Sequence, residues 1–509
     1  AAGGRIWLKG SSSCRSARID GVAEPVALDP PYYVAIVEAP VGDRSVTFVG
    51  EDGPIRVVTV RVPDGARLDT RAPFSALFFG DFQPFVIDDG RVRVNAGEEF
   101  ASADGRDDAH PPHTLVATRK LFELAACGKL PFPAPSYACG VGDQVYVEGD
   151  YHAWDRYGQQ HPMSAWSVEA QPRPRVGVAA LPGFLDRCYR GHWSFPVFER
   201  ALQVCPALMT WDDHDIRDGW GSHGDEHVYR DSFFRVFRDA YVAHQYRRGP
   251  RLWTPEQQPI DAPLWQSFTV HGVPTFVLDL RTCRDVAVPT VMGDAQWREL
   301  RAWFASLDPQ RSKHYVLVAS VPLFFRVGER AKIAAAFGDE VRDDLLDTWT
   351  SSVNEGEWRQ LVQEIASAGA RGLRGLIVSG DYHVNALCRV TATRAGGSPE
   401  VIAYEMIASG LANDSYGDWK QKMARKGWFL ETPIELPDSD LHTEFSFAEP
   451  CPSFGGLQFD GEAITAHMFQ ATGDGLFQMR VPLTWSTTGA AWRAMVAGAR
   501  TRIDDRLLR

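Results

Sequence analysis

Four short segments of the sequence place carboxylate and imidazole side chains directly after apolar runs. They are GDFQ (80–83), GDQVY (142–146), WDDHD (211–215) and GDYHVN (380–385). Like charges repel, and an unpaired buried carboxylate is costly, so a positive partner must accompany these segments if they meet. Carboxylate oxygens with a few imidazoles suit cations such as Mn, Fe, Zn, Mg or Ca.

Each segment on its own has a simpler explanation. A single Gly-Asp pair is typical of a surface turn, and WDDHD also suits the N-terminal cap of a following helix. Four such segments, each at the end of an apolar run, are harder to explain as turns. A shared metal centre would neutralise all of them. No cysteine lies in the four segments, which argues against a thiolate-rich zinc site.

An alternation of strands and helices would bring these segments together. Apolar, strand-like runs cover residues 74–79, 136–141, 207–211, 275–280, 315–320 and 376–379. Amphipathic helical patterns cover residues 114–127, 233–246, 294–307 and 357–370. This alternation predicts an α/β fold, in which polar residues gather at the carboxyl ends of the strands.

The two ends of the chain differ from this central part. Residues 1–72 contain β-branched runs and no helical period, which predicts a small β-sandwich-like domain. Residues 73–490 are then the main domain, which carries the four acidic segments and a late strand at 477–485, and residues 491–509 are predicted to form a helical tail. Residues 411–456 lack clear periodicity and predict an extended loop region.

The composition narrows the classes of function. The 509 residues carry a net charge of -12 and give a pI of about 5.6, which argues against a dominant nucleic-acid-binding surface and leaves nucleic acid only as a substrate. No apolar run reaches the roughly 18 residues of a membrane span. The eight cysteines are scattered without a CxxC pair. Neither a compartment nor an oligomeric state can be inferred from these features.

The ordered set of motifs resembles the alkaline phosphatase D (PhoD-type) group of the metallophosphoesterase superfamily. The matching segments are GDQVY (142–146), TWDDHDI (210–216), LDLR (278–281), MGDAQWRELRAWF (292–304) and GDYH (380–383). The similarity covers roughly residues 74–410. TWDDHD is the specific part of the match, whereas the Gly-Asp motifs alone are not specific.

The resemblance implies a fold and an activity. The fold would be a two-layer β-sandwich core flanked by helices, an αββα arrangement, with a multinuclear metal site at the strand ends. The activity would be hydrolysis of small-molecule phosphate mono- or diesters by a hydroxide formed from metal-held water. Two or more ions are expected, Fe(III) with Ca first and Mn or Zn as alternatives. The location would be periplasmic or secreted, with a cytoplasmic one also open.

Other functions on the same scaffold stay open. They are a phosphotriesterase, a phospholipase-like hydrolase, and a catalytically inactive binding protein. The last would require lost ligand positions, and apart from one glutamine discussed below the motifs keep theirs.

Six residues are expected to bind metal: Asp81, Asp143, Tyr146, Asp213, Asp381 and His383. Asp143 is the candidate for a bridging ligand, because one carboxylate can hold two cations about 3.5–4 Å apart. Tyr146 either ligates a ferric ion as phenolate or packs with its hydroxyl hydrogen-bonded. Asp381 and His383 would reach one centre if their segment is extended, because alternate side chains of a strand share a face.

Three further residues are expected to act on the substrate: His214, Arg281 and Asn385. His214 would contact the phosphoryl group or protonate the leaving oxygen, and the alternative is a structural histidine bonded to Asp215. Arg281 would clamp phosphate oxygens or instead pair with nearby carboxylates. Asn385 would share the face of the extended segment and touch phosphate.

Two positions depart from the related proteins. Asp81 stands where the PhoD-type group commonly has an iron-binding cysteine, and Gln83 stands where the wider superfamily has histidine. The first metal position would therefore hold another metal, or iron without thiolate. HPPH (110–113) and SHGDEH (222–227) are either surface polar loops or extra contacts to metal or substrate.

Overall fold

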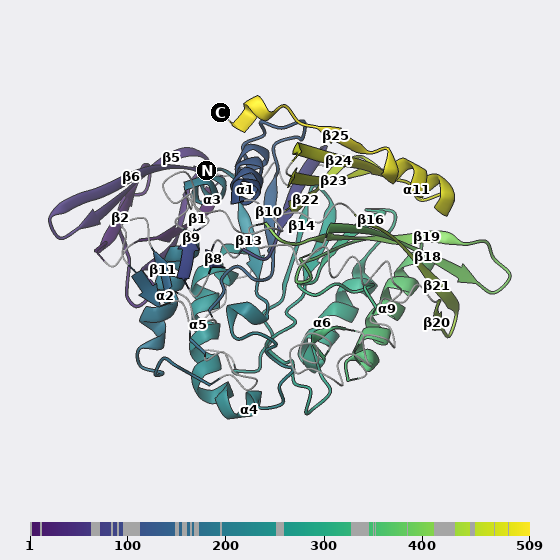
Figure 1. Cartoon of the computed structure of the whole chain (residues 1–509), viewed down its shortest axis with the longest axis horizontal. Helices are drawn as coiled ribbons and strands as arrows, with labels where there is room; N and C mark the ends of the chain where they lie inside the picture. The colour runs from purple at the N-terminus through teal and green to yellow at the C-terminus, as the bar shows by residue number, and fades with distance from the viewer. Residues whose placement is uncertain are drawn as a thin grey trace.

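We analysed a computed structural model of the chain (Figure 1). It describes residues 3–10, 13–62, 72–82, 85–88, 91–94, 112–147, 152–154, 160–162, 165–166, 173–193, 196–250, 259–326, 346–349, 351, 353–383, 385–411, 433–447, 453–472, 474–486 and 488–508. The predicted departure at Gln83 and the start of the HPPH segment, residues 110–111, lie outside these ranges. No helix in the described ranges combines the length and apolar character that crossing a bilayer requires.

The N-terminal region consists of strands with a small core of their own. The strands are β1 (Gly3–Lys9), β2 (Ser16–Ile19), β3 (Val26–Ala27), β4 (Val34–Pro40), β5 (Gly42–Gly50) and β6 (Gly53–Val62). β1 pairs with β4, and the other strands form a sheet in the order β3-β2-β5-β6. Ile6, Ala17 and Val46 belong to the buried cluster between them. Alternating burial along these strands is typical of a small β-sandwich.

Two large β-sheets form the centre of the molecule (Figure 1). The first sheet has the order β13 (Ala207–Thr210), β10 (Tyr137–Val141), β7 (Phe74–Phe79), β22 (Ser453–Asp460), β23 (Ala463–Thr472), β24 (Gly475–Leu483) and β25 (Arg500–Arg502). The second sheet has the order β14 (Gln266–Val270), β15 (Val273–Val277), β16 (His314–Val318), β17 (Arg374–Ser379), β19 (Glu400–Ala408), β18 (Asn385–Arg394), β21 (Ser439–Phe447) and β20 (Ile434–Leu436).

Helices cover the outer faces of both sheets. They are α1 (Pro112–Ala126), α2 (Leu181–Trp193), α3 (Pro196–Val204) and α5 (Arg235–His244) on the first sheet, and α6 (Gly293–Ser306) and α9 (Glu355–Ala370) on the second. On β7, Phe78 points into the core between the sheets, whereas Leu77 and Phe79 point towards the helices. This αββα order, with strands on the N-terminal side, confirms the predicted fold class.

The remaining elements are short. They are the hairpins β8 (Phe85–Asp88) with β9 (Arg91–Val94) and β11 (His152–Trp154) with β12 (Gln160–Pro162), the helices α4 (Glu226–Tyr229) and α11 (Gly489–Ala497), and the turns η3 (Asp213–Asp215), η4 (Arg230–Phe234), η5 (Tyr246–Arg248) and η7 (Asp505–Leu508).

The strands that precede the predicted ligands share one edge. β7, β10 and β13 run parallel in the first sheet, and β16 runs parallel to β17 in the second. The two sheets approach closely there because the strand ends carry glycine. A Cβ at Gly380 would lie 2.9 Å from the carbonyl oxygen of Val141, and a Cβ at Gly142 would lie 2.9 Å from the side chains of Asp212 and Ser320. Glycine therefore lets the ligand-bearing turns converge.

Two sequence-based predictions differ from the structure. Within residues 411–456, β20, β21 and the start of β22 are strands, because their backbones complete the edges of the two sheets. Residues 491–509 contain most of α11 and the turn η7, as the predicted helical tail requires, but also the strand β25. Trp492 of α11 is buried between the sheets, and β25 pairs with β24.

Candidate metal centre

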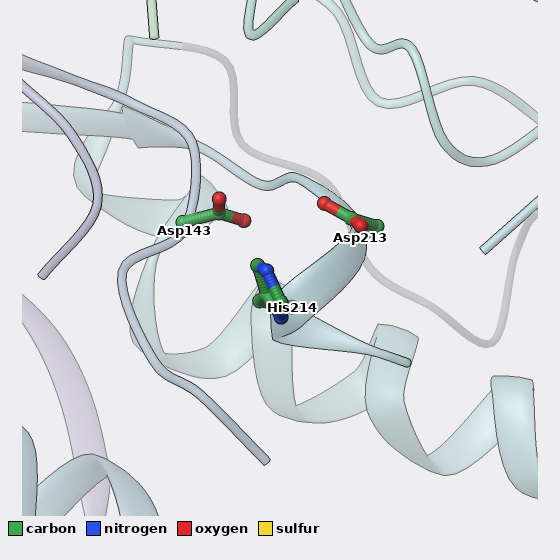
Figure 2. A group of neighbouring side chains, drawn as sticks. All are labelled: Asp143, Asp213 and His214. Atoms are coloured by element: carbon green, nitrogen blue, oxygen red, sulfur yellow. The ribbon is translucent and has the colours of Figure 1, made fainter. Parts of the chain in front are cut away.

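Carboxylates from three strand ends meet in one group. Asp143 follows β10, Asp212 and Asp213 follow β13, and Asp381 follows β17. One oxygen of each lies within 4.8 Å of the others, and Asp143, Asp213 and His214 form an overlapping set within the same limit. Figure 2 shows Asp143 and Asp213 with their carboxylates turned towards each other and the His214 ring beside the gap. We call Asp143, Asp212, Asp213 and Asp381, together with His214, the carboxylate group.

A second set of donor atoms lies around His383. Its Nε2 is 3.2 Å from Oδ1 of Asp81 and 3.3 Å from the hydroxyl of Tyr146. Two atoms bound at right angles to one cation lie about 3 Å apart, so these separations fit a shared ion. The ring of Tyr146 stacks on that of His214 at 4.2 Å between centroids, which links this set to the carboxylate group. We call Asp81, Tyr146 and His383 the tyrosine group.

The backbone is strained at the predicted ligands. Six non-glycine residues of the described chain have positive φ, and four of them are Asp81 (55°), Asp143 (53°), Asp381 (68°) and His383 (49°). This left-handed conformation is unfavourable for residues with a Cβ and tends to persist at functional sites. Its concentration at the strand ends indicates that the fold holds these side chains in place for a ligand.

The prediction of an extended segment at Asp381 and His383 is wrong. Asp381 and His383 are both left-handed, and the backbone N–H of Tyr382 turns back to the carbonyl of Gly380 at 2.9 Å. The two side chains therefore serve different places. Asp381 reaches the carboxylate group, whereas His383 reaches the tyrosine group.

Asp143 is a buried carboxylate whose acceptors are unused. It is 1% exposed, and neither oxygen accepts a hydrogen bond from the described residues. Burial raises the pKa of Asp143 well above its ordinary value, and Asp213, Asp212 and Asp81 add to this, although His214 opposes it. An unsatisfied carboxylate among other carboxylates requires a positive partner, and a cation fits this position.

Asp212 belongs to the site although the sequence pointed only to Asp213. Its Oδ1 accepts hydrogen bonds from Ser320 and Arg281, but its Oδ2 is buried without a partner in the described chain. Burial raises the pKa of Asp212 to about 6 despite the opposing charge of Arg281. The adjacent Asp213 accepts from the backbone N–H of Gly219 at 2.7 Å. The DD pair was the available signal, but sequence alone does not show that both carboxylates turn inward.

Arg281 lies under the carboxylate group with its guanidinium fully engaged. Its Nε donates to Asp212, and its Nη1 donates to Asp347 and to the carbonyl of Trp220. Its Nη2 donates to Asp347 at 2.7 Å and faces Asp213 at 3.3 Å. Because all five N–H donors face protein acceptors, the structure shows the ion-pair alternative for Arg281, not a phosphate clamp.

Comparison with known proteins identifies the family. A sequence model described as PhoD-like phosphatase matches residues 133–433, more than half of the chain. The chain belongs to the PhoD-like phosphatase family. The solved "Structure of PhoD" matches this PhoD-like chain with a TM-score of 0.58 at 12% identity, covering 96% of this chain and 92% of that one. The family match confirms the predicted resemblance to the PhoD-type group, and the likeness to the solved structure confirms the predicted fold.

Two further proteins are similar to this chain. The uncharacterized protein YGR266W of Saccharomyces cerevisiae is 22% identical over 320 residues, which is 50% of this chain and 45% of that protein. The chain thus spans less than half the length of this relative. A purple acid phosphatase of yellow lupin (Lupinus luteus) seeds, PPD1, matches with a TM-score of 0.43 at 10% identity, covering 92% of this chain and 67% of that one.

A buried hydrogen-bond network supports the site of this PhoD-like protein. Oδ2 of Asp215 accepts the backbone N–H groups of Asp212 at 2.9 Å and of Gln144 at 3.4 Å. Its Oδ1 accepts from Gln245 at 2.7 Å. Burial raises the pKa of Asp215 to about 7 against these hydrogen bonds. Asp215 thereby joins the turn that carries Asp143 to the turn that carries Asp212.

Two other predicted contacts are held by hydrogen bonds within the protein. Asn385 is 1% exposed at the start of β18, and its Oδ1 accepts a hydrogen bond from Ser453 of β22. The SHGDEH segment is organised by Glu226, whose Oε1 accepts the backbone N–H groups of Gly221 and His223, each at 3.0 Å. A contact of Asn385 with phosphate stays a prediction, and SHGDEH has the geometry of a structured polar turn.

Proposed function

We propose that this protein hydrolyses phosphate esters with at least two metal ions held between the tyrosine group and the carboxylate group. Asp143 carries the proposal for two reasons. Its unsatisfied carboxylate lies in the carboxylate group, and it also interacts electrostatically with Asp81 of the tyrosine group. Bridging two cations would satisfy both of its oxygens.

The residues on either side of Asp143 would divide the ions between them. On one side, the tyrosine group offers a carboxylate oxygen of Asp81, the hydroxyl oxygen of Tyr146 and a ring nitrogen of His383. On the other side, the carboxylate group offers oxygens of Asp212, Asp213 and Asp381. When bound, the cations supply a nucleophile by acidifying water and neutralise charge on the phosphate.

His214 is placed to handle the leaving group. It is partly exposed, unlike Asp143, and its ring nitrogen lies within 4.8 Å of oxygens of Asp143 and Asp213. Stacking on Tyr146 fixes the ring plane. From this position a protonated imidazole donates its proton to the departing alkoxide. Arg281 acts indirectly, because it holds Asp212 and Asp213 in the orientation that the cations need.

We propose Fe(III) with Ca as the native ions and Mn or Zn as substitutes. All donors of the two groups are oxygen or imidazole nitrogen, and a phenolate such as Tyr146 favours a ferric ion over a divalent one. Hard oxygen ligands on the other side suit Ca²⁺ or Mn²⁺. A violet absorption band in the purified protein would support a bond between Tyr146 and iron.

The test combines elemental analysis with two substrates. Purified protein should retain metal after desalting and should hydrolyse p-nitrophenyl phosphate or bis(p-nitrophenyl) phosphate, with activity lost on chelation and restored by added ions. The ratio of the two rates decides between monoester and diester preference. Fewer than about one bound ion per chain, together with no turnover after addition of Mn, Ca or Fe, would contradict the proposal and favour an inactive binding protein.

A further inference from the structure

One serine connects two residues of the tyrosine group that come from different sheets. Ser409 follows β19 directly and is 1% exposed. Its hydroxyl donates a hydrogen bond to Oδ2 of Asp81, which follows β7 of the first sheet. The hydroxyl oxygen of Ser409 in turn accepts a hydrogen bond from the backbone N–H of His383, which follows β17 of the second sheet, at 2.8 Å. Ser409 therefore uses its donor and an acceptor at once, one on each neighbour.

This contact gives the two oxygens of Asp81 different roles. Oδ2 accepts hydrogen bonds from the Ser409 hydroxyl and from the backbone N–H of Gly410 at 3.1 Å. Oδ1 accepts no hydrogen bond in the described chain and faces Nε2 of His383 at 3.2 Å. A carboxylate can present either oxygen or both to a cation. Here Ser409 and Gly410 occupy Oδ2 of Asp81, which leaves Oδ1 available to a cation.

Ser409 also holds His383. The residue has a positive φ of 49°, so its backbone needs support from the surroundings. With its N–H bound to Ser409, its Nε2 faces both Asp81 and the Tyr146 hydroxyl. Three donor atoms, Oδ1 of Asp81, the hydroxyl oxygen of Tyr146 and Nε2 of His383, thus converge.

We propose that Ser409 is a positioning residue for the tyrosine group, which makes Asp81 a one-oxygen ligand and fixes His383 against it. The proposal deepens the proposed function and rests on it, because it requires a cation at this group. Removal of the hydroxyl frees Asp81 to rotate and removes an acceptor from the His383 backbone. Loss of such an outer partner typically weakens metal binding by about 10–100-fold.

The test compares Ser409→Ala with Ser75→Ala. Ser75 is also a fully buried serine, and it lies on β7, the strand that leads to Asp81, but its hydroxyl donates to the carbonyl of Pro133 at 2.8 Å, away from the site. Metal-free samples of both variants and of the wild type are titrated with Mn²⁺ by calorimetry. Thermal unfolding is recorded with Mn²⁺ and with a chelator.

Ser409→Ala should bind at least one Mn²⁺ about tenfold more weakly, whereas Ser75→Ala should match the wild type. The midpoint of unfolding of Ser409→Ala should fall in the presence of Mn²⁺ more than in chelator, because only the bound state loses the added stabilisation. A merely structural serine would lower both midpoints equally. Ser409→Thr, which keeps the hydroxyl, should retain affinity within about threefold.

Equal Mn²⁺ affinity for Ser409→Ala and wild type would overturn the role of Ser409 alone. A folded Ser409→Thr variant that binds Mn²⁺ about tenfold more weakly than the wild type would do the same, and this comparison with the wild type remains decisive if Ser409→Ala does not fold. A wild-type protein that binds no Mn²⁺ and hydrolyses neither p-nitrophenyl ester would overturn the proposed function together with this inference.

Discussion

Asp143 and Asp213 follow two adjacent parallel strands and bring their carboxylate oxygens within 4.8 Å of each other in the protein interior. Both are nearly fully buried, at 1% and 5% exposure. Two like charges so placed are stable only with a cation or a proton between them. A bound cation would relieve this repulsion, and the consequences can be measured.

Replacing the central carboxylate should abolish function without unfolding the protein. Asp143→Asn keeps the shape of the side chain but removes the charge that would bridge two ions. We expect turnover and metal content to fall by more than the roughly 10–100-fold caused by loss of an outer partner. In chelator the variant should be at least as stable as the wild type, because carboxylate repulsion is relieved. Full activity would contradict the bridging role.

The leaving-group role of His214 can be tested by changing the substrate. His214→Ala should lower turnover of alkyl phosphate esters by about 10²–10⁴-fold, the usual range for lost acid catalysis. p-Nitrophenyl esters should suffer less, because p-nitrophenolate leaves without protonation. Metal content measured by elemental analysis should not change. Loss of metal in this variant would instead identify His214 as a ligand.

Arg281 should matter for stability even when no metal is bound. Arg281→Met leaves Asp347 and Asp212 buried without their partner, and breaking a buried ion pair costs about 3–5 kcal/mol. We expect that loss in the free energy of unfolding, measured by urea titration in chelator. Asp347→Asn in the Arg281→Met background should recover part of it. Additive losses in this double-mutant cycle would exclude a coupled pair.

Acid should destabilise the protein through a histidine that belongs to neither group of the metal centre. His467 on β23 is buried between Gln458 and Gln478, and its Nδ1 accepts a hydrogen bond from Gln478 at 2.7 Å. Burial, with a smaller effect of Arg480, lowers the pKa of His467 to about 3. In the unfolded chain the imidazole of His467 binds a proton at about pH 6.5, whereas in the folded chain it stays neutral down to a much lower pH. The free energy of unfolding therefore decreases as the pH falls below about 6.5.

Between pH 7.5 and 5.0 this histidine should remove about 2 kcal/mol from the free energy of unfolding. His467→Gln should lack that part of the pH dependence in urea titrations. His442→Gln, which changes a partly exposed histidine on β21, should keep it. Identical pH profiles for wild type and His467→Gln would contradict the argument.

The sequence predicted the strands of the site well because they are short apolar runs buried on both faces. The run at 74–79 coincides with β7, and the run at 376–379 falls within β17. Each is followed by a Gly-Asp pair, and in a parallel sheet such ends share an edge. Local pattern and global fold agree at these positions, so three of the four grouped carboxylates, Asp143, Asp213 and Asp381, could be named in advance, whereas Asp212 was missed.

Other features of the site depend on contacts that no local pattern records. Ser409 meets Asp81 across 328 positions of the chain. From the sequence, Arg281 could equally have bound phosphate or paired with carboxylates. Its ion pair with Asp347, which lies 66 positions further along the chain, appears only in the structure. The turn after β17 was predicted to be extended because left-handed backbone at Asp381 and His383 is imposed by tertiary contacts, not by local preference.

The proposed ligands come from both sheets of the sandwich: Asp81 and Asp143 follow strands of the first sheet, and Asp381 and His383 follow a strand of the second. An ion bound by residues of both sheets would link the sheets at the place where Gly80 and Gly380 lie close together. Catalytic competence and mechanical cohesion then share one origin. Without such an ion the two sheets should be held together less strongly, so removal of metal should lower stability as well as activity.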